Sequence, residues 1–165
     1  MSVLADIRLS ILIFGPDPKS PPGGFVGDLA RKRVEIRDAL VADGHTACFP
    51  EDLMTGSPDP DLNNAFLFEE LLVRKYDMIV HLVASYGSVS ELSLFMRDGN
   101  RIASKVALYF NKDHETGIAY HQAAVVKKLG ASLHSYVYPV DITACNLMTN
   151  VREKVEIVRL AKFYS

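Results

Sequence analysis

The sequence predicts an α/β fold, a three-layer sandwich in which helices cover both faces of a five-stranded parallel sheet. Short apolar runs of strand type alternate with stretches of helical periodicity along the 165 residues. The third and fourth runs are apolar nearly throughout, as in strands that are covered on both faces. The length suffices for one hydrophobic core, so residues 1–165 are expected to form a single domain.

The strands are separated by intervals that leave room for a helical crossover. Short, right-handed crossovers favour the flavodoxin-like order 2-1-3-4-5, with strand one inside the sheet, over the Rossmann-like order 3-2-1-4-5. The strands are expected at Leu9–Phe14, Thr46–Pro50, Asp77–Val83, Val106–Phe110 and Leu133–Tyr138.

Helices are expected between these strands and after the last one. The first carries one apolar stripe and ends at Gly44, and the fourth has its own apolar face. The stripe of the first helix is Val26, Leu29, Ile36 and Leu40, and the face of the fourth is Ile118, Val125 and Leu129. The later helices are expected from Asp61 to Lys75, Ser88 to Asp98, Gly117 to Gly130 and Leu147 to Phe163.

Composition narrows the function classes. Eighteen Lys and Arg against twenty Asp and Glu give a net charge of −2, which disfavours nucleic acid and an anionic membrane surface as partners. The apolar runs are too short to span a bilayer, so a cytoplasmic protein is expected. Cys48 and Cys145 have neither CxxC spacing nor clustered histidines, so no disulfide, metal or other cofactor is expected. A mean hydropathy of +0.09 in a short chain favours a homo-oligomer.

Two connections exceed the usual length of a strand-to-helix loop, which is about two to six residues. They span residues 15–24 (GPDPKSPPGG) and 50–60 (PEDLMTGSPDP), and both follow strands. The carboxyl edge of such a sheet is where ligands bind. In the first loop the Gly15-Pro16 turn, with Gly24 just before the first helix, could let backbone N–H groups and the helix N-terminus hold a phosphate. A proline-stiffened surface loop explains these residues equally well.

The segment SYGSVSEL, residues 85–92, leads from the third strand into a helix. Ser88 and Glu91 form a capping box, which accounts for both residues structurally. Their position at the carboxyl edge also places a carboxylate in the first turn of a helix, where the dipole favours an anion. A glutamate in such a cleft can act as a nucleophile or stabilise an oxocarbenium ion.

Further candidates lie near the same edge. Arg33 falls on the apolar stripe of the first helix and needs an anion: a structural ion pair, a ligand phosphate or the carboxylate of Glu91. Glu51 and Asp52 follow the second strand and could contact a ribose or a base, or be solvated loop acids.

Three more residues come from the third and fourth strands or from the segments directly after them. Asn111 ends the fourth strand and could bind a ribose or phosphate oxygen, while Tyr86 could stack on a base. His81 lies among apolar neighbours and is expected to be a core histidine satisfied by one hydrogen bond, without a catalytic role.

The order of ILIFGP, a helix with Arg31 and Arg33, GHTACFPED, YDMIVHLV and SYGSVSEL resembles the nucleoside 2-deoxyribosyltransferase family over residues 8–112. That family has an aspartate near the start of a strand, matched here by Asp77, and an element D-x-G-[ST]-x-x-E whose glutamate attacks the anomeric carbon of the sugar. Here Gly87, Ser88 and Glu91 match the element, and Ser85 stands in place of its leading aspartate.

The resemblance implies cleavage of an N-glycosidic bond in a nucleoside, a nucleotide or a nucleotide cofactor, by hydrolysis or base transfer. Glu91 would be the nucleophile or the oxocarbenium stabiliser. Ser85 in place of an acid leaves the proton source open and favours a cationic leaving group, such as the nicotinamide of NAD. A divergent, defence-associated member of the family would suit this substitution.

Two alternatives stand beside this hypothesis. Toll/interleukin-1 receptor-type NAD glycohydrolases also place a glutamate in a helix after a central strand, but their WC pair is absent here. A non-catalytic nucleotide-binding module would keep the cleft without turnover, and the serine at position 85 supports it.

Overall fold

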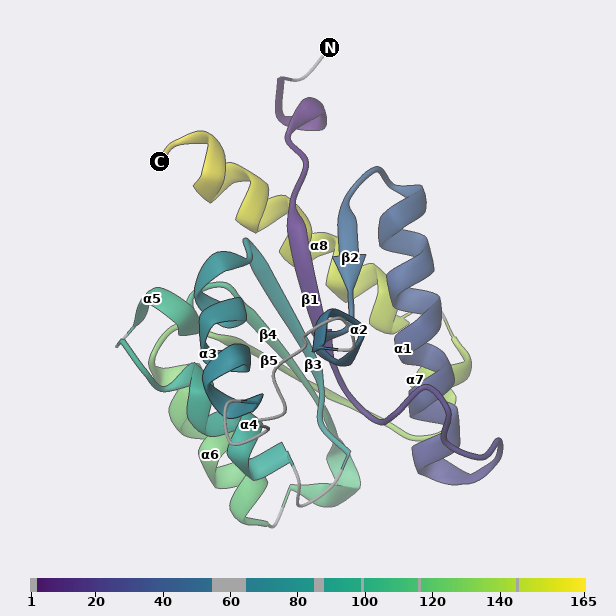
Figure 1. Ribbon diagram of the computed structural model, residues 1–165. Coiled ribbons are helices and arrows are strands. Elements are labelled where there is room, and N and C mark those ends of the chain that lie inside the picture. The colour runs from purple at the N-terminus through teal and green to yellow at the C-terminus, as the bar shows by residue number, and fades with distance from the viewer. Residues whose placement is uncertain (1–2, 55–64, 85–87, 99, 116, 145) are drawn as a thin grey trace.

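The computed structural model describes residues 3–54, 65–84, 88–98, 100–115, 117–144 and 146–165 (Figure 1). Its parallel strands form one sheet in the order β2-β1-β3-β4-β5, which confirms the predicted order and places β1 inside the sheet. The strands are β1 Ser10–Phe14, β2 Thr46–Cys48, β3 Met78–Leu82, β4 Val106–Asn111 and β5 Ser132–Tyr136.

Helices cover both faces of the sheet, with α1, α7 and α8 on one side and α3, α4, α5 and α6 on the other (Figure 1). The larger helices are α1 Gly24–Ala42, α3 Ala65–Lys75, α4 Ser88–Phe95, α6 Ile118–Lys128 and α8 Asn146–Phe163. Short helices are η1 Val3–Asp6, α2 Pro50–Met54, α5 Asn100–Ala103, η3 Lys112–His114 and α7 Val140–Thr143. None of these described helices is long and apolar enough to cross a membrane.

The two faces of the sheet form two cores because side chains alternate along each strand. Ile11 and Ile13 of β1 pack toward α1 and α8, whereas Leu12 and Phe14 pack toward α3, α4 and α6. These side chains are buried, and each contributes roughly 1.5–3 kcal/mol to folding. The double burial explains why the central strands are apolar nearly throughout, with His81 of β3 as an exception.

The apolar faces of two helices differ from the prediction. Val26 in the first turn of α1 is exposed, while Gly27 packs against the loop at Pro21. In α6 Ile118 and Val125 are also exposed, and the buried positions are Ala123 and Val126. The apolar residues of α6 itself are distributed over several sides of the helix, so their spacing alone does not determine which side faces the sheet.

Helix boundaries differ mainly where short helices occupy predicted loops. Pro50 begins α2 and is followed by two acidic residues, which is a typical helix start that the loop assignment overlooked. The third predicted helix ends at Phe95, and Asp98 adopts a left-handed conformation (φ 57°) before α5. The expected helix start at Asp61 lies outside the described residues.

Candidate active site

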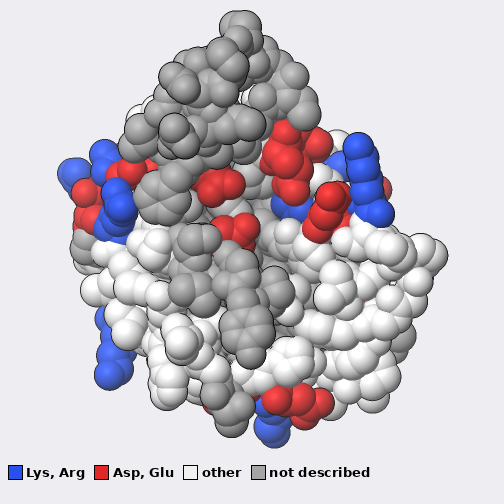
Figure 2. Space-filling model, turned by 60° about the horizontal axis from the view of Figure 1, so that its bottom comes forward, with Lys and Arg blue, Asp and Glu red and all other residues white. Residues whose placement is uncertain are grey.

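The site lies where the chain leaves neighbouring strands toward opposite faces of the sheet. From β1 the chain continues into α1 on one face, and from the adjacent β3 into α4 on the other. Ligands bind at such a switch point, outside the carboxyl ends of the strands. Figure 2 brings this edge of the molecule forward and shows acidic side chains gathered there.

Glu91 and His81 meet at this edge. Glu91 lies in the first turn of α4, where the helix dipole attracts a negative charge. Its Oε2 is 2.9 Å from Nε2 of His81, which comes from the penultimate position of β3. The Glu91 side chain is 29% exposed, so it reaches the surface while its carboxylate contacts a buried ring.

His81 is wholly buried (0% exposed) yet poorly satisfied. Phe14 and Phe95 contact its ring edge to face, with ring centroids 5.8 and 5.6 Å away. Nε2 lies at ion-pair distance from Glu91 without the alignment of a hydrogen bond, and Nδ1 has no hydrogen-bond partner among the described residues. The expected single hydrogen bond of a core histidine is therefore absent from the described part of the chain. A buried polar group left in this state is costly and points to a functional role.

A second acidic residue, Glu69, comes from α3. Burial of its carboxyl and the negative charges of Glu91 and Glu51 raise the pKa of Glu69 to about 7. No residue of the described ranges pairs a cation with it, whereas the adjacent Glu70 bonds to Arg74 and Arg97 at 3.1 Å each. Two consecutive glutamates of one helix therefore have opposite environments.

Arg33 has a protein partner, which confirms the structural ion pair among the predicted alternatives. It is 1% exposed and binds Glu51 of α2 through both η nitrogens, at 2.5 and 3.0 Å. Its Nε and Nη2 donate to Ile13 O, and Nη1 also donates to Pro16 O. These bonds use all five N–H groups of a guanidinium. A phosphate would have to displace Glu51, so Arg33 acts as a clamp that ties the ends of β1 and β2 together.

Gly15 is required for this clamp. A Cβ at position 15 would lie 3.0 Å from Cδ of Arg33 and 3.4 Å from Cβ of Leu82. The guanidinium also covers the Phe49 ring, with its central carbon 4.2 Å from the ring centroid. The close approach of β1 to Arg33 thus fixes where Glu51 stands.

The remaining predicted residues occupy the same edge in different roles. Asp52 is exposed in α2, and Gly24 begins α1 with a φ of 71°. Asn111 is buried at the end of β4, where its Oδ1 accepts a hydrogen bond from Asp113 N and caps η3. Ser88 begins α4.

Ser85, Tyr86 and Gly87 lie outside the described residues, so their predicted roles at the site stay predictions. Within the described ranges, no group of three or more His, Cys, Asp or Glu is arranged to hold a metal ion.

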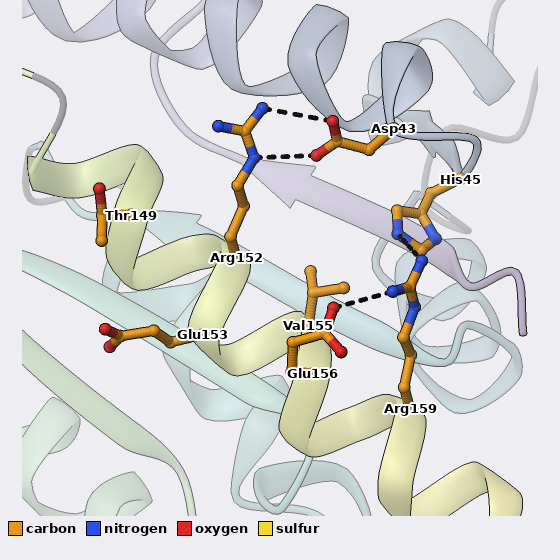
Figure 3. A pocket seen from close by; sticks show the side chains of 8 residues that line it. All are labelled: Asp43, His45, Thr149, Arg152, Glu153, Val155, Glu156 and Arg159. Carbon is orange, nitrogen blue, oxygen red and sulfur yellow. Dashed lines mark hydrogen bonds and ion pairs between the residues drawn. The ribbon is translucent and has the colours of Figure 1, made fainter. Parts of the chain in front are cut away.

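The opposite, amino edge of the sheet carries a groove of about 520 Å³ between α8 and the end of α1 (Figure 3). Four of its charged side chains pair within the protein: Arg152 with Asp43 at 2.9 Å and Arg159 with Glu156 at 2.8 Å. Asp77 lies at the amino end of β3, where it accepts hydrogen bonds from Ser10 N, Ser10 Oγ and Lys162 Nζ. The Asp77 carboxylate therefore ties strand starts together at the edge away from Glu91.

Residues 30–164 match the family model described as STM3845 retron effector protein. The chain belongs to this family. The matched range includes the clamp, Glu69, His81 and Glu91. A search of curated proteins gave no match.

Membership of the STM3845 retron effector family agrees with the expected defence association, because the family consists of effectors by its description. The match carries no information about nucleosides or N-glycosidic bonds.

Two residues of the site carried no functional prediction from the sequence: Glu69, which was not singled out, and His81, which was expected to be a core histidine. Glu69 precedes the buried Val73 by one helical turn, so a carboxylate on an otherwise apolar stripe was the available signal. His81 precedes the end of β3 by one residue, which places it next to the first turn of the following helix. Neither signal identifies the partner, because both contacts depend on how α3 and α4 pack.

Proposed function

We propose that this effector cleaves the N-glycosidic bond of a nucleoside, a nucleotide or NAD, with Glu91 as the group that acts on the sugar. The observation that carries the proposal is the position of Glu91: the first turn of α4, after a central strand, with its carboxylate 2.9 Å from the buried His81 ring. A carboxylate held there can attack a carbon that develops positive charge. The resemblance of GSVSEL to the deoxyribosyltransferase element supports the same role.

In the proposed reaction a Glu91 oxygen attacks C1′ of the sugar as the C1′–N bond breaks and its electron pair leaves with the base. Water then attacks C1′ and releases the Glu91 carboxylate. The net reaction consumes one water and gives the free base and the sugar. A second base in place of water would give transfer.

His81 is a positioning residue in this scheme. Its Nε2 lies 2.9 Å from one carboxylate oxygen of Glu91, and this contact would restrict the carboxylate while the second oxygen acts on the sugar. The Arg33–Glu51 clamp has a similar part on the other side of the switch point, since it fixes the chain after β2.

The test is release of base from guanosine, deoxyguanosine, their 5′-monophosphates and NAD, followed by chromatography with the purified protein. We expect at least one substrate to be cleaved and Glu91→Gln to lose the activity while the protein stays folded, because glutamine can still complete a capping box. Glu156→Gln on α8, where the side chain is 59% exposed, is the matched control and should keep the activity.

Calorimetric titration separates the enzyme from a binding module. Saturable binding of a nucleotide without product, unchanged in Glu91→Gln, would identify a nucleotide-binding protein instead. If neither cleavage nor binding is seen with any of these compounds, the proposal is wrong.

A further inference from the structure

We propose that Glu69 is the general acid of the site and protonates the leaving base, so that the substrates carry a neutral nucleobase. This inference rests on the proposed N-glycosidic cleavage. With a serine at position 85 in place of an acid, the proton source of the reaction is open, and Glu69 would supply it. Glu69 lies on α3, outside the segment that resembles the deoxyribosyltransferase element.

Geometry is the first support. Glu69 lies half-buried on α3, which packs against α4, and the charges of both Glu91 and Glu51 act on its carboxyl. The next residue, Glu70, is bound to Arg74 and Arg97, so cations of this helix surface are directed to Glu70 instead. Glu69 of α3 and Glu91 of α4 thus lie on two helices that pack together, and the described residues provide no cation shared between them. Glycoside cleavage commonly uses two such carboxyl groups.

His81 gives an independent indication that something binds here. Its ring is wholly buried and aimed into the cluster, with Nε2 2.9 Å from Glu91, and no aligned hydrogen-bond partner occurs in the described ranges. A buried polar group without an aligned partner calls for an explanation, and a ligand bound at this edge would supply one. The acids therefore lie around an incompletely satisfied polar group, which distinguishes them from a solvated acidic surface.

The protonation state fits the role. Burial of Glu69 and its neighbours Glu91 and Glu51 raise the pKa of Glu69 to about 7, close to the value at which an acid catalyst works best in neutral solution. This is the pattern in which two nearby carboxyl groups take different parts, one as acid and one as nucleophile.

The proton balance closes over the two steps. As the C1′–N bond breaks, the Glu69 hydroxyl gives its proton to a ring nitrogen of the base, and the base leaves neutral. Glu69, now a carboxylate, then accepts a proton from the water that attacks C1′. Glu69 ends protonated and Glu91 ends as a carboxylate, as both began.

The experiment compares two leaving groups in one assay. The guanine base of guanosine leaves as an anion unless one of its ring nitrogens is protonated. The base of 7-methylguanosine already carries a positive charge, so it leaves as a neutral molecule and needs no acid. We expect Glu69→Gln to slow base release from guanosine by about a hundredfold or more, the range for a general acid, and release from 7-methylguanosine by less than about threefold. Glu70→Gln is the matched control on the same helix and should change neither rate.

The pH profile provides a second readout that a structural role would not change. With wild-type protein, guanosine cleavage should fall as pH rises through about 7, the pKa of Glu69, and this decline should be absent for 7-methylguanosine and in Glu69→Gln.

The outcomes separate the two proposals. Equal slowing of both substrates by Glu69→Gln, or slowing of neither, overturns the acid role while N-glycosidic cleavage stands. Cleavage of NAD or 7-methylguanosine but not of guanosine by the wild-type protein does the same. No base release from any substrate by the wild-type protein refutes the proposed function itself.

Discussion

Two buried histidines lie at opposite edges of the sheet and are satisfied in opposite ways. His45 precedes β2 at the amino edge, where its Nδ1 accepts a hydrogen bond from Leu9 N at 3.1 Å and its Nε2 lies 3.1 Å from Arg159 (Figure 3). His81 lies near the carboxyl edge, and neither of its ring nitrogens has an aligned hydrogen bond within the described residues.

The charges around the two histidines follow the same division. At the amino edge Asp43 and Glu156 each face an arginine. At the carboxyl edge, by contrast, the charges of Glu91 and Glu51 act against Glu69. The carboxyl edge combines the poorly satisfied His81 ring with the Glu69 carboxyl, which has no cation partner in the described residues, and for this reason we assign that edge to chemistry and the amino edge to stabilisation of the fold.

The largest stability effect is expected for a fully hydrogen-bonded group at the carboxyl edge, the Arg33 clamp. Arg33→Met keeps the packing stem but leaves Ile13 O and Pro16 O without their donor. We expect the free energy of unfolding to fall by about 2–4 kcal/mol, below the full cost of breaking a buried pair because Glu51 is 46% exposed. Urea unfolding measures it.

Arg37→Met is the control for the clamp. Arg37 also covers the Phe49 ring, at 4.6 Å, but its ion-pair partner Asp38 is 64% exposed. A loss below about 1 kcal/mol is expected. If both variants lose equally, stacking on Phe49 and not the clamp stabilises this edge.

The two histidines give the next prediction. His45→Phe removes the acceptor of the buried Leu9 N–H and should cost about 1–3 kcal/mol of unfolding free energy. His81→Phe places a ring between Phe14 and Phe95 and removes an unsatisfied polar group, so stability should change by less than about 1 kcal/mol.

The rate of base release should rank the two histidine variants in the opposite order from stability. His81→Phe frees the Glu91 carboxylate and should lower the activity strongly, whereas His45→Phe should leave the rate of the folded fraction unchanged. A destabilised but active His81→Phe variant would assign His81 to the fold.

The division between edges also explains what the sequence could predict. Strand order and the burial of Arg33 follow from hydrophobic patterning and crossover rules, which act locally along the chain. Glu91 was found because its element is contiguous in sequence. The partner of Arg33 was not identified, because the contact with Glu51 arises from pairing of β1 with β2 and the turn into α2.

The rest of the site depends on helix packing that no local pattern specifies. The side of α3 that carries Glu69 toward Glu91 is set by contacts with α2 and α4. The same uncertainty of helix orientation made the apolar face of α6 wrong at Ile118 and Val125. Sequence reasoning therefore recovers elements and their order better than the side chains that meet between them.

A smaller effect is expected in the pH dependence of stability. Burial and the charges of Glu91 and Glu51 raise the pKa of Glu69 from 4.5 to about 7, so the folded state binds more protons than the unfolded state between these values. Protonation of Glu69 therefore stabilises the folded state. This contribution to the free energy of unfolding is complete below about pH 4.5 and is lost as the pH rises through about 7. We expect Glu69→Gln to gain about 1 kcal/mol relative to wild type between pH 5 and 8, after allowance for the half-exposed carboxyl.

Urea unfolding of wild type and Glu69→Gln at pH 5 and pH 8 measures this difference. Other titratable groups contribute equally to both proteins, so their effect cancels in the comparison. His45 acts in the opposite direction, since burial and Arg159 lower its pKa, and the folded state therefore gains stability as pH rises toward 6.5. If the free energy of unfolding of Glu69→Gln depends on pH in the same way as that of wild type, the proposed repulsion between Glu69 and the neighbouring carboxylates is wrong.

The smallest effect is expected in the amino-edge groove. Arg152→Ala breaks the ion pair with Asp43, in which the two side chains are 52% and 34% exposed. Such exposed pairs contribute about 0.2–1 kcal/mol, and salt screens them, so the loss should shrink further in 1 M NaCl. The rate of base release should stay within about twofold of wild type, because the groove and Glu91 lie at opposite edges of the sheet. Chemical denaturation at two salt concentrations and the guanosine assay check both statements. A large loss of activity in Arg152→Ala, with stability retained, would assign the chemistry to the groove and reverse the roles of the two edges.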